Sequence, residues 1–266
     1  PTFEMTSARF RQIRQILWLY FWLLIFEGAL RKWLLPGLAN PLLLVREPLA
    51  LLAIYWGWPL LRKRRWQQWL QPLFVIGPLA FVLAISVGHG DFFTALYGLR
   101  VLLIQLPLIF VFASVFDRDD VIRFAWVVLV LSIPMTVLLV LQSNQPDSHI
   151  LNIGSGGLGT ASFSGALDRS RPSGTFSFIT GVVGFYSLAA ASLFILLYNT
   201  RINQGGRLIC VVAAIALVVA LPVSISRSLL AGYIMVVLAA VASLALSRVK
   251  LWPLFVGLLG LALAIG

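Results

Sequence analysis

The sequence predicts an all-α protein, a polytopic bundle of transmembrane helices. Hydrophobic residues make up 60% of the chain, and its mean hydropathy is +0.97. Apolar runs of about 18 residues or more recur along its length, and a helix needs about this length to cross a bilayer. The alternation of apolar and polar residues that is typical of membrane barrel strands is absent. We therefore expect about nine spans in a single transmembrane domain over residues 1–266.

Short polar connections separate the expected spans. The apolar runs cover residues 16–35, 42–61, 70–87, 94–116, 121–141, 176–198, 208–223 and 229–246, and a ninth begins at Leu251. Clusters of Pro, Gly and Asn mark turns between them. The longest polar segment, about 142–175, is rich in Gly, Ser and Asn. Because the chain ends inside an apolar run at Gly266, we expect that a C-terminal part of the protein is missing from it.

The positions of Lys and Arg predict the orientation, because cytoplasmic loops carry the excess of these residues. With the N-terminus in the cytoplasm and alternating spans, most of the 20 Lys and Arg residues lie inside, including the run from Arg62 to Arg65. The 142–175 loop then lies outside, on the periplasmic face of a bacterial inner membrane. The net charge of +11 follows from this topology, so we expect no nucleic-acid partner.

Residues suited to metal or disulfide chemistry are scarce. The single cysteine, Cys210, lies in an apolar run, and the two histidines, His89 and His149, are too few for a metal cluster. We expect no metal and no cofactor.

The remaining cations fall at the expected outer face or within its leaflet. They are Arg31, Lys32, Arg46, Arg100, Arg169, Arg171 and Arg227. Arg100 lies roughly 9 Å below the outer end of its helix, where an unpaired charge costs on the order of 2–3 kcal/mol.

The acids on the same side are fewer than these cations. They are Glu27, Glu47, Asp91, Asp147 and Asp168. Arg46 and Glu47 are adjacent, and we expect each to pair with a charged residue on another helix. Taken singly, each cation has two interpretations, an interhelical or snorkelling charge and a ligand contact. Taken together, the set favours a polyanion site, because the guanidinium fork suits phosphate oxygens.

The stretch from Asp168 to Gly184 is the strongest candidate for such a site. Arg169 and Arg171 come just before the apolar run that starts at Phe176. Ser173, Gly174 and Thr175 offer a turn and a hydroxyl at the expected helix N-cap. A helix N-terminus beside two guanidinium groups attracts anions. A lipid-linked diphosphate suits this place, since its tail lies in the bilayer and its head at the interface. The alternative is a loop with two snorkelling arginines.

Two motifs in the same region resemble the O-antigen polymerase and O-antigen ligase family. One is Arg171-Pro-Ser-Gly-Thr-Phe, which leads into a helix with Gly181 and Gly184. The other is Ser226-Arg227-Ser-Leu-Leu-Ala-Gly232, one span later. The resemblance covers about residues 171–246. It departs from the family pattern at Phe178-Ile-Thr180, where Asn-Pro-Asn is usual, and at Ser228, where Gly is common.

The resemblance implies an enzyme that transfers or polymerises a glycan from an undecaprenyl-diphosphate carrier at the outer face, without a metal. Arg171 and Arg227 would stabilise the leaving diphosphate, and Glu47, Asp168 or His149 would be the available bases. The substrate-binding residues would be Arg31, Arg46, Arg100, Arg169 and Thr175. The family's second outer loop, which carries an essential Arg or His, does not occur within this chain. The implied partners are a lipid-linked oligosaccharide, membrane lipids and other proteins.

Two alternatives stay open at this level. One is a transporter of a small anion such as bicarbonate, and the other is a non-catalytic membrane subunit of a larger complex.

The orientation can be tested by cysteine labelling. In a variant that lacks Cys210, a cysteine at Ser155 should react with an impermeant reagent in intact cells, because the 142–175 loop lies outside. A cysteine at Arg64 is the inside control. Labelling at Ser155 that needs permeabilised membranes would reverse the orientation.

Overall fold

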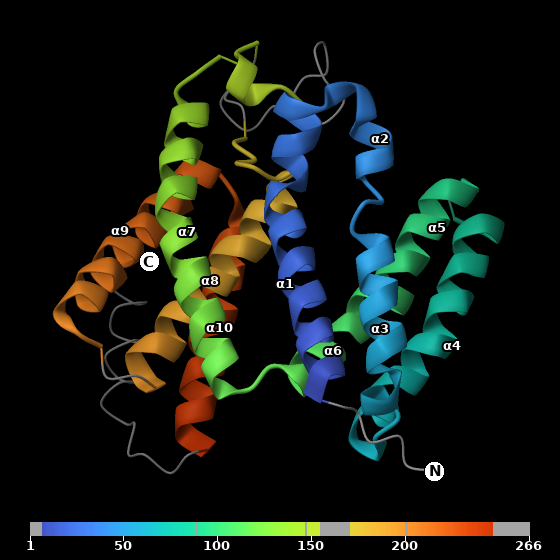
Figure 1. Cartoon of the computed structure of the whole chain (residues 1–266). Coiled ribbons are helices and arrows are strands. Elements are labelled where there is room, and N and C mark those ends of the chain that lie inside the picture. The colour runs from blue at the N-terminus through green and yellow to red at the C-terminus, as the bar shows by residue number, and fades with distance from the viewer. Residues whose placement is uncertain (1–6, 89, 147, 155–170, 200–201, 247–266) are drawn as a thin grey trace. The chain divides into compact units, whose positions relative to one another are not determined.

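The computed structural model describes residues 7–88, 90–146, 148–154, 171–199 and 202–246. These residues form helices and connecting turns, with no strand among them (Figure 1). Seven helices in this part of the chain are long and apolar enough to cross a membrane. The prediction of an all-α, multi-pass membrane protein is therefore confirmed. The described chain divides into two compact units. Unit 1 holds residues up to Arg31 and from Gly37 to Val121, and unit 2 holds Lys32–Pro36 and the chain from Ile122 onward.

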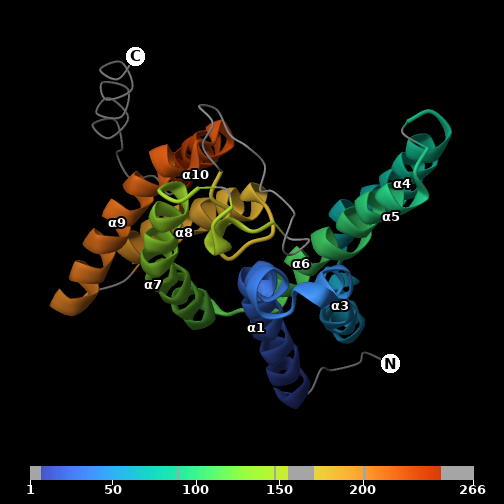
Figure 2. The same ribbon diagram turned by 90° about the horizontal axis from the view of Figure 1, so that it is seen from above.

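Unit 1 contains two helix pairs. Its helices are α1 (Ser7–Ala29), α2 (Ala39–Leu42), α3 (Glu47–Leu61), α4 (Arg64–Ser86), α5 (Phe92–Arg100) and α6 (Leu106–Val115). Helix α1 packs against α3, and α4 against α5 (Figure 2). A π-helical segment, η3 (Val101–Gln105), joins α5 to α6, and another, η1 (Leu30–Leu34), follows α1.

The core of unit 1 lies between α1, α3 and α6. Ile13 and Leu17 of α1, Ala53 of α3 and Val111 of α6 are fully buried there. A Cβ added to Gly57 of α3 would lie 3.0 Å from a methyl carbon of Val111, so α3 and α6 approach closely at this glycine. Because Gly57 has no side chain, the two helices can pack closely here, as small residues allow between helices in a bilayer.

The start of α7 (Arg118–Ser143) is capped in unit 1. The Asp120 N–H donates to the Asp117 carboxylate over 2.9 Å, and the Asp117 N–H donates back to Asp120 over 3.2 Å. Arg14 of α1 pairs with both carboxylates, at 3.4 Å and 3.0 Å. The Asp120 N–H, together with Arg14, holds the pKa of the exposed Asp117 carboxyl below its usual range. The stability from this cap is thus present at neutral pH and is lost as the pH falls through the lowered pKa.

Unit 2 is built from the rest of α7 with α8 (Ile179–Asn199), α9 (Gln204–Ser224) and α10 (Arg227–Leu246). Neutral hydrogen bonds join the first three of these helices. The buried Thr136 hydroxyl of α7 lies 2.6 Å from the Tyr186 hydroxyl of α8 and donates to the Ala216 carbonyl of α9 at 3.3 Å. Such bonds satisfy polar groups that would be costly in an apolar interior.

Helices α8 and α10 pack side by side in the same direction. Gly232, near the start of α10, lies against Ser187, and Leu244, near its end, shares a pocket with Tyr198 at the end of α8. Both helices therefore begin on the same side of unit 2, as predicted from the single span between them.

Two details of the expected spans differ in the structure. The second span consists of α2 and the 15-residue α3, which is too short to count among the seven. Helix α5 starts at Phe92 because the Asp91 side chain caps it by accepting hydrogen bonds from Phe93 and Thr94. Arg100 thus lies about 12 Å from the start of its helix, at 1.5 Å per residue. The expected span from Leu251 lies outside the described residues, and the single domain over 1–266 stays a prediction.

Candidate functional site

A largely buried ion cluster joins three helices of unit 1 and collects four of the predicted site residues. Arg46, just before α3, pairs with Glu27 of α1. Glu47, the first residue of α3, pairs with Arg100 of α5, with Oε1 and Nη1 3.3 Å apart. The expectation that Arg46 and Glu47 each find a partner on another helix is therefore confirmed. We call Glu27, Arg31, Arg46, Glu47 and Arg100 the ion cluster.

Arg31 is the third arginine of the ion cluster. Its Nη1 lies 3.6 Å from Glu27 Oε1, one helical turn earlier, and its Nε donates to the Ala39 carbonyl at 2.7 Å. Two aromatic rings flank the other arginines. The Arg46 guanidinium lies 5.9 Å from the Tyr20 ring centroid, and that of Arg100 lies 5.3 Å from the Tyr97 ring. Both contacts fall within the range of a cation–π interaction.

The ion cluster does not satisfy all of its own polar groups. Both carboxylate oxygens of Glu47 are buried without a hydrogen bond to the described residues. The same holds for Nε and Nη1 of Arg100, since the 3.3 Å ion pair lacks hydrogen-bond alignment. Buried charged groups in this condition are costly, so each unmet bond calls for a further polar partner.

In unit 2, the predicted motif around Arg171 forms a tight turn. Gly174 adopts a left-handed conformation with φ +58°, and the Phe176 N–H donates to the Ser173 carbonyl at 3.0 Å. The Gln142 side chain of α7 accepts from the Gly174 N–H at 2.8 Å. The ammonium of Lys32 is buried here and donates to Ser173 Oγ at 2.5 Å and to the Gly174 carbonyl at 3.2 Å.

This turn corrects the expected start of the helix. The sequence predicted an N-cap among Ser173, Gly174 and Thr175 and a helix from Phe176, whereas α8 begins at Ile179. The positive φ of Gly174 is incompatible with a helical turn, so the helix starts only after it. Thr175 is not the N-cap, and its hydroxyl lies 3.8 Å from the Met135 sulfur of α7.

Arg171 and Arg227 differ from the arginines of the ion cluster. Both side chains are exposed, and neither has an ion pair or hydrogen bond to the residues that the structure describes. Arg227 is the first residue of α10 and follows Ile225, which is left-handed with φ 49°. A β-branched residue in this conformation is strained by roughly 1–2 kcal/mol, and such strain tends to occur at functional positions.

Of the other predicted site residues, one has a structural role and two lie outside the described residues. The His149 Nδ1 accepts from the Leu151 N–H at 3.2 Å and caps a short 3₁₀ turn, η4 (Ile150–Asn152), which is an ordinary structural role. Asp168 and Arg169 lie outside the described residues. Among the residues that are described, no group of three His, Cys, Asp or Glu side chains could hold a metal ion.

Sequence reasoning missed three residues that organise these regions. Glu27 was counted as an outer acid but not as a site residue, although its i,i+4 spacing to Arg31 within an apolar run was a usable signal. Lys32 was counted only as one more outer cation. Nothing in the sequence marks Gln142 as part of this turn, because its partner Gly174 lies 32 residues away along the chain.

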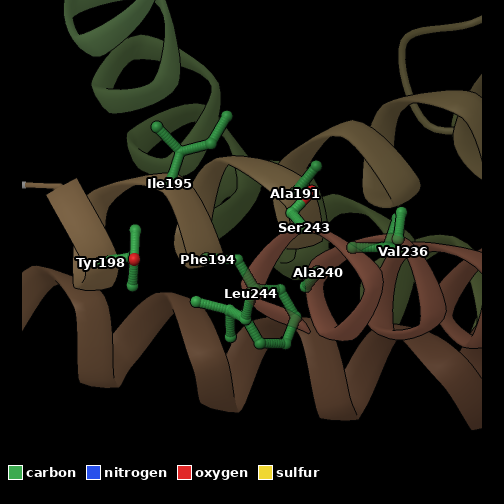
Figure 3. A pocket seen from close by; sticks show the side chains of 9 residues that line it. Ala191, Phe194, Ile195, Tyr198, Val236, Ala240, Ser243 and Leu244 are labelled. Carbon is green, nitrogen blue, oxygen red and sulfur yellow. The ribbon is translucent and has the colours of Figure 1, made fainter. Parts of the chain in front are cut away.

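An apolar pocket of about 380 Å³ lies between α8 and α10. Figure 3 shows Phe194 and Tyr198 from α8 and Val236 and Leu244 from α10 around it. The small residues Ala240 and Ser243 also line the pocket.

No family model, no curated protein and no solved structure matches this chain. The class of protein that the fold defines is a helical multi-pass membrane protein, and the resemblance to O-antigen polymerases and ligases stays a prediction.

The Ser173–Gly174 turn can be tested by substitution. In Gly174→Ala, the new Cβ would have a positive φ and would fall 2.7 Å from the Met135 sulfur. We expect a loss of roughly 1–3 kcal/mol in the free energy of unfolding, measured on the purified protein in detergent. Gly184→Ala, within α8, is the matched control, because a Cβ there meets nothing within 4 Å. Equal effects of the two variants would contradict the strain argument.

Proposed function

We propose that the chain transfers or polymerises a glycan carried on a lipid-linked diphosphate, with Arg171 and Arg227 gripping the diphosphate on the side we predict to be outside. One observation carries the proposal. Two exposed arginines without partners among the described residues stand just before α8 and at the first position of α10, and these helices begin on the same side of unit 2.

The electrostatics of α10 support an anion at Arg227. A cation at the N-terminus of a helix faces the positive end of the helix dipole, which is unfavourable by about 0.3–1 kcal/mol. A bound anion offsets this unfavourable interaction, because the guanidinium and the free N–H groups then attract the same ligand. As a glycosidic bond to the carrier breaks, charge grows on the diphosphate, and arginines already in place stabilise it. This chemistry needs no protein-bound metal in principle.

The arginines of the ion cluster are less suited to this role. Arg31, Arg46 and Arg100 already pair with Glu27 or Glu47. We therefore assign the diphosphate to Arg171 and Arg227 alone. Glu47 is likewise engaged with Arg100, and His149 caps the η4 turn, which leaves Asp168 as the candidate base from the predicted set.

The pocket between α8 and α10 suits the hydrocarbon of such a carrier. Val236 and Leu244 stand about 14 Å and 26 Å along α10 from Arg227, at 1.5 Å per residue. Half of a hydrocarbon core is about 15 Å thick, so the pocket lies at or beyond the depth that an ordinary acyl chain reaches from the Arg227 side. A long polyprenyl chain reaches it with its head still at Arg227.

The central test is replacement of each arginine by lysine. Arg171→Lys and Arg227→Lys keep the charge but lose the planar fork that binds two phosphate oxygens. The loss of one directed bond to a charged group should lower transfer by about 10- to 150-fold. The assay is transfer of labelled glycan from undecaprenyl diphosphate in vesicles, normalised to inserted protein. Arg207→Lys, an exposed arginine at the start of α9, is the control and should keep normal transfer. Near-normal transfer by both test variants would favour a non-catalytic subunit or a small-anion transporter.

The pocket makes a separate prediction about carrier length. Ala240→Phe fills space beside Phe194 and displaces about two methylene groups of the carrier, at about 0.8 kcal/mol each, so use of long carriers should fall by about tenfold. Transfer from a short prenyl diphosphate should change little. Ala242→Phe, on the same helix but outside the pocket lining, is the matched control. Equal losses with long and short carriers would contradict this role of the pocket.

A further inference from the structure

We propose that the turn between α3 and α4 binds one anionic phospholipid, with the phosphate at the turn and the acyl chains along α4. We call Arg62, Lys63, Arg64 and Arg65 the basic turn. It belongs to unit 1, and the inference does not depend on the glycan transfer proposed for unit 2. Three observations carry it: the charge of the turn, the contact that holds Arg65, and an exposed apolar face that continues from it.

The basic turn concentrates four positive charges without a nearby acid in the sequence. All four side chains are exposed, and none has an ion pair or hydrogen bond to the residues that the structure describes. The sequence has no Asp or Glu between Glu47 and Asp91. Asp117 and Asp120, which follow α6, pair with Arg14 instead. Like charges in so short a segment repel one another, and a bound anion relieves this repulsion.

The start of α4 strengthens the preference for an anion. Lys63 has an extended backbone, and α4 begins directly after it at Arg64. Among the described residues, no side chain caps the free N–H groups of this end, and its first turn contains no acid. The positive end of the helix dipole therefore lies beside Arg64 and Arg65. A phosphate can accept from the N–H groups and from the guanidinium groups together.

Trp66 holds one arginine of the basic turn in place. Its Nε1 donates to the Ser114 hydroxyl of α6 at 2.8 Å, and its ring centroid lies 5.2 Å from that of Phe110. The Arg65 guanidinium lies 4.4 Å from the centroid of the Trp66 ring. This cation–π contact restrains the Arg65 side chain, so less rotamer freedom is lost when the side chain binds a phosphate.

An exposed apolar face continues from Arg65 along α4. Trp69 and Ile76 lie on the same face as Arg65, because their spacings are close to whole turns of 3.6 residues. Their exposed fractions are 66% and 52%. At 1.5 Å per residue, Trp69 stands about 6 Å and Ile76 about 17 Å along the helix from Arg65. The first distance suits an interfacial tryptophan, and the second is close to the depth of one leaflet.

A phospholipid fits this surface better than the other possible occupants. A soluble anion or a nucleic acid would use the charges but not the apolar face. A second copy of the chain, inserted in the same direction, would carry its own basic turn at the same depth, so a symmetric pair along α4 would bring like charges together. An anionic phospholipid has its charge and its chains at the two depths that the surface offers.

The first experiment measures lipid binding to the purified full chain in detergent by native mass spectrometry. Phosphatidylglycerol should bind about 30-fold more tightly than phosphatidylcholine, which is the effect of two cations close to the lipid charge. Glycerol phosphate has the charged group without the chains and should not displace the lipid at equal concentration. Equal binding of the two lipids, or displacement by glycerol phosphate, would overturn the proposal. Dimers without bound lipid would assign the surface to a second copy.

The second experiment separates this site from the net charge of the chain. Arg64→Gln combined with Arg65→Gln should lower phosphatidylglycerol binding by about 30-fold, and the corresponding Lys pair should keep most of it because the charge remains. The matched control removes two other exposed arginines with Arg123→Gln and Arg207→Gln and should bind the lipid as the wild type does. An equal loss in the control would overturn the site. If the double Gln variant does not insert, Arg65→Gln alone decides, with an expected loss of about fivefold.

Discussion

The organisation of unit 1 depends on the pairing of buried charges. Glu27, Arg46, Glu47 and Arg100 come from α1, the start of α3 and the end of α5, and each would be costly alone in an apolar interior. Pairing therefore restricts which helices can be neighbours and at what height. The short α3 illustrates this, because its two leading charged residues reach different partners and fix its N-terminal end between α1 and α5. Among the described residues, the carboxylate oxygens of Glu47 and two nitrogens of Arg100 are left without an aligned hydrogen bond.

In unit 2, hydrogen bonds between neutral groups join the helices. The Thr136, Tyr186 and Ala216 contacts join α7, α8 and α9, while Gln142 holds the Gly174 turn from both its N–H and its carbonyl side. Among the described residues, Lys32 is the one buried cation of this unit that contributes to the turn. Arg171 and Arg227 take no part in these bonds and are exposed. The same residue type thus serves packing in unit 1 and recognition, as we propose, in unit 2.

Local sequence signals predicted the helices well but their ends less well. The apolar runs after Arg118 and Gln204 became α7 and α9, since a run of this length in a bilayer has to satisfy its backbone within one helix. The start of α8 was wrong by three residues, because the turn at Gly174 is stabilised by Gln142 and Lys32, which are remote in sequence. Helix α5 begins at Phe92, two residues before the predicted start at Thr94, because the Asp91 side chain caps it there.

The sequence by itself determined that this protein is a helical multi-pass membrane protein and that most of its lysines and arginines lie on one side of the predicted spans. Both properties depend on composition along the chain, and backbone hydrogen bonding inside a helix is local. Only the tertiary structure decided which arginines are paired. Arg46 and Arg171 look alike in sequence, yet one pairs with Glu27 with only 12% of its side chain exposed, and the other is exposed without a described partner. The difference arises because ion pairing requires two helices to meet at the same height, and the sequence of neither helix alone specifies that meeting.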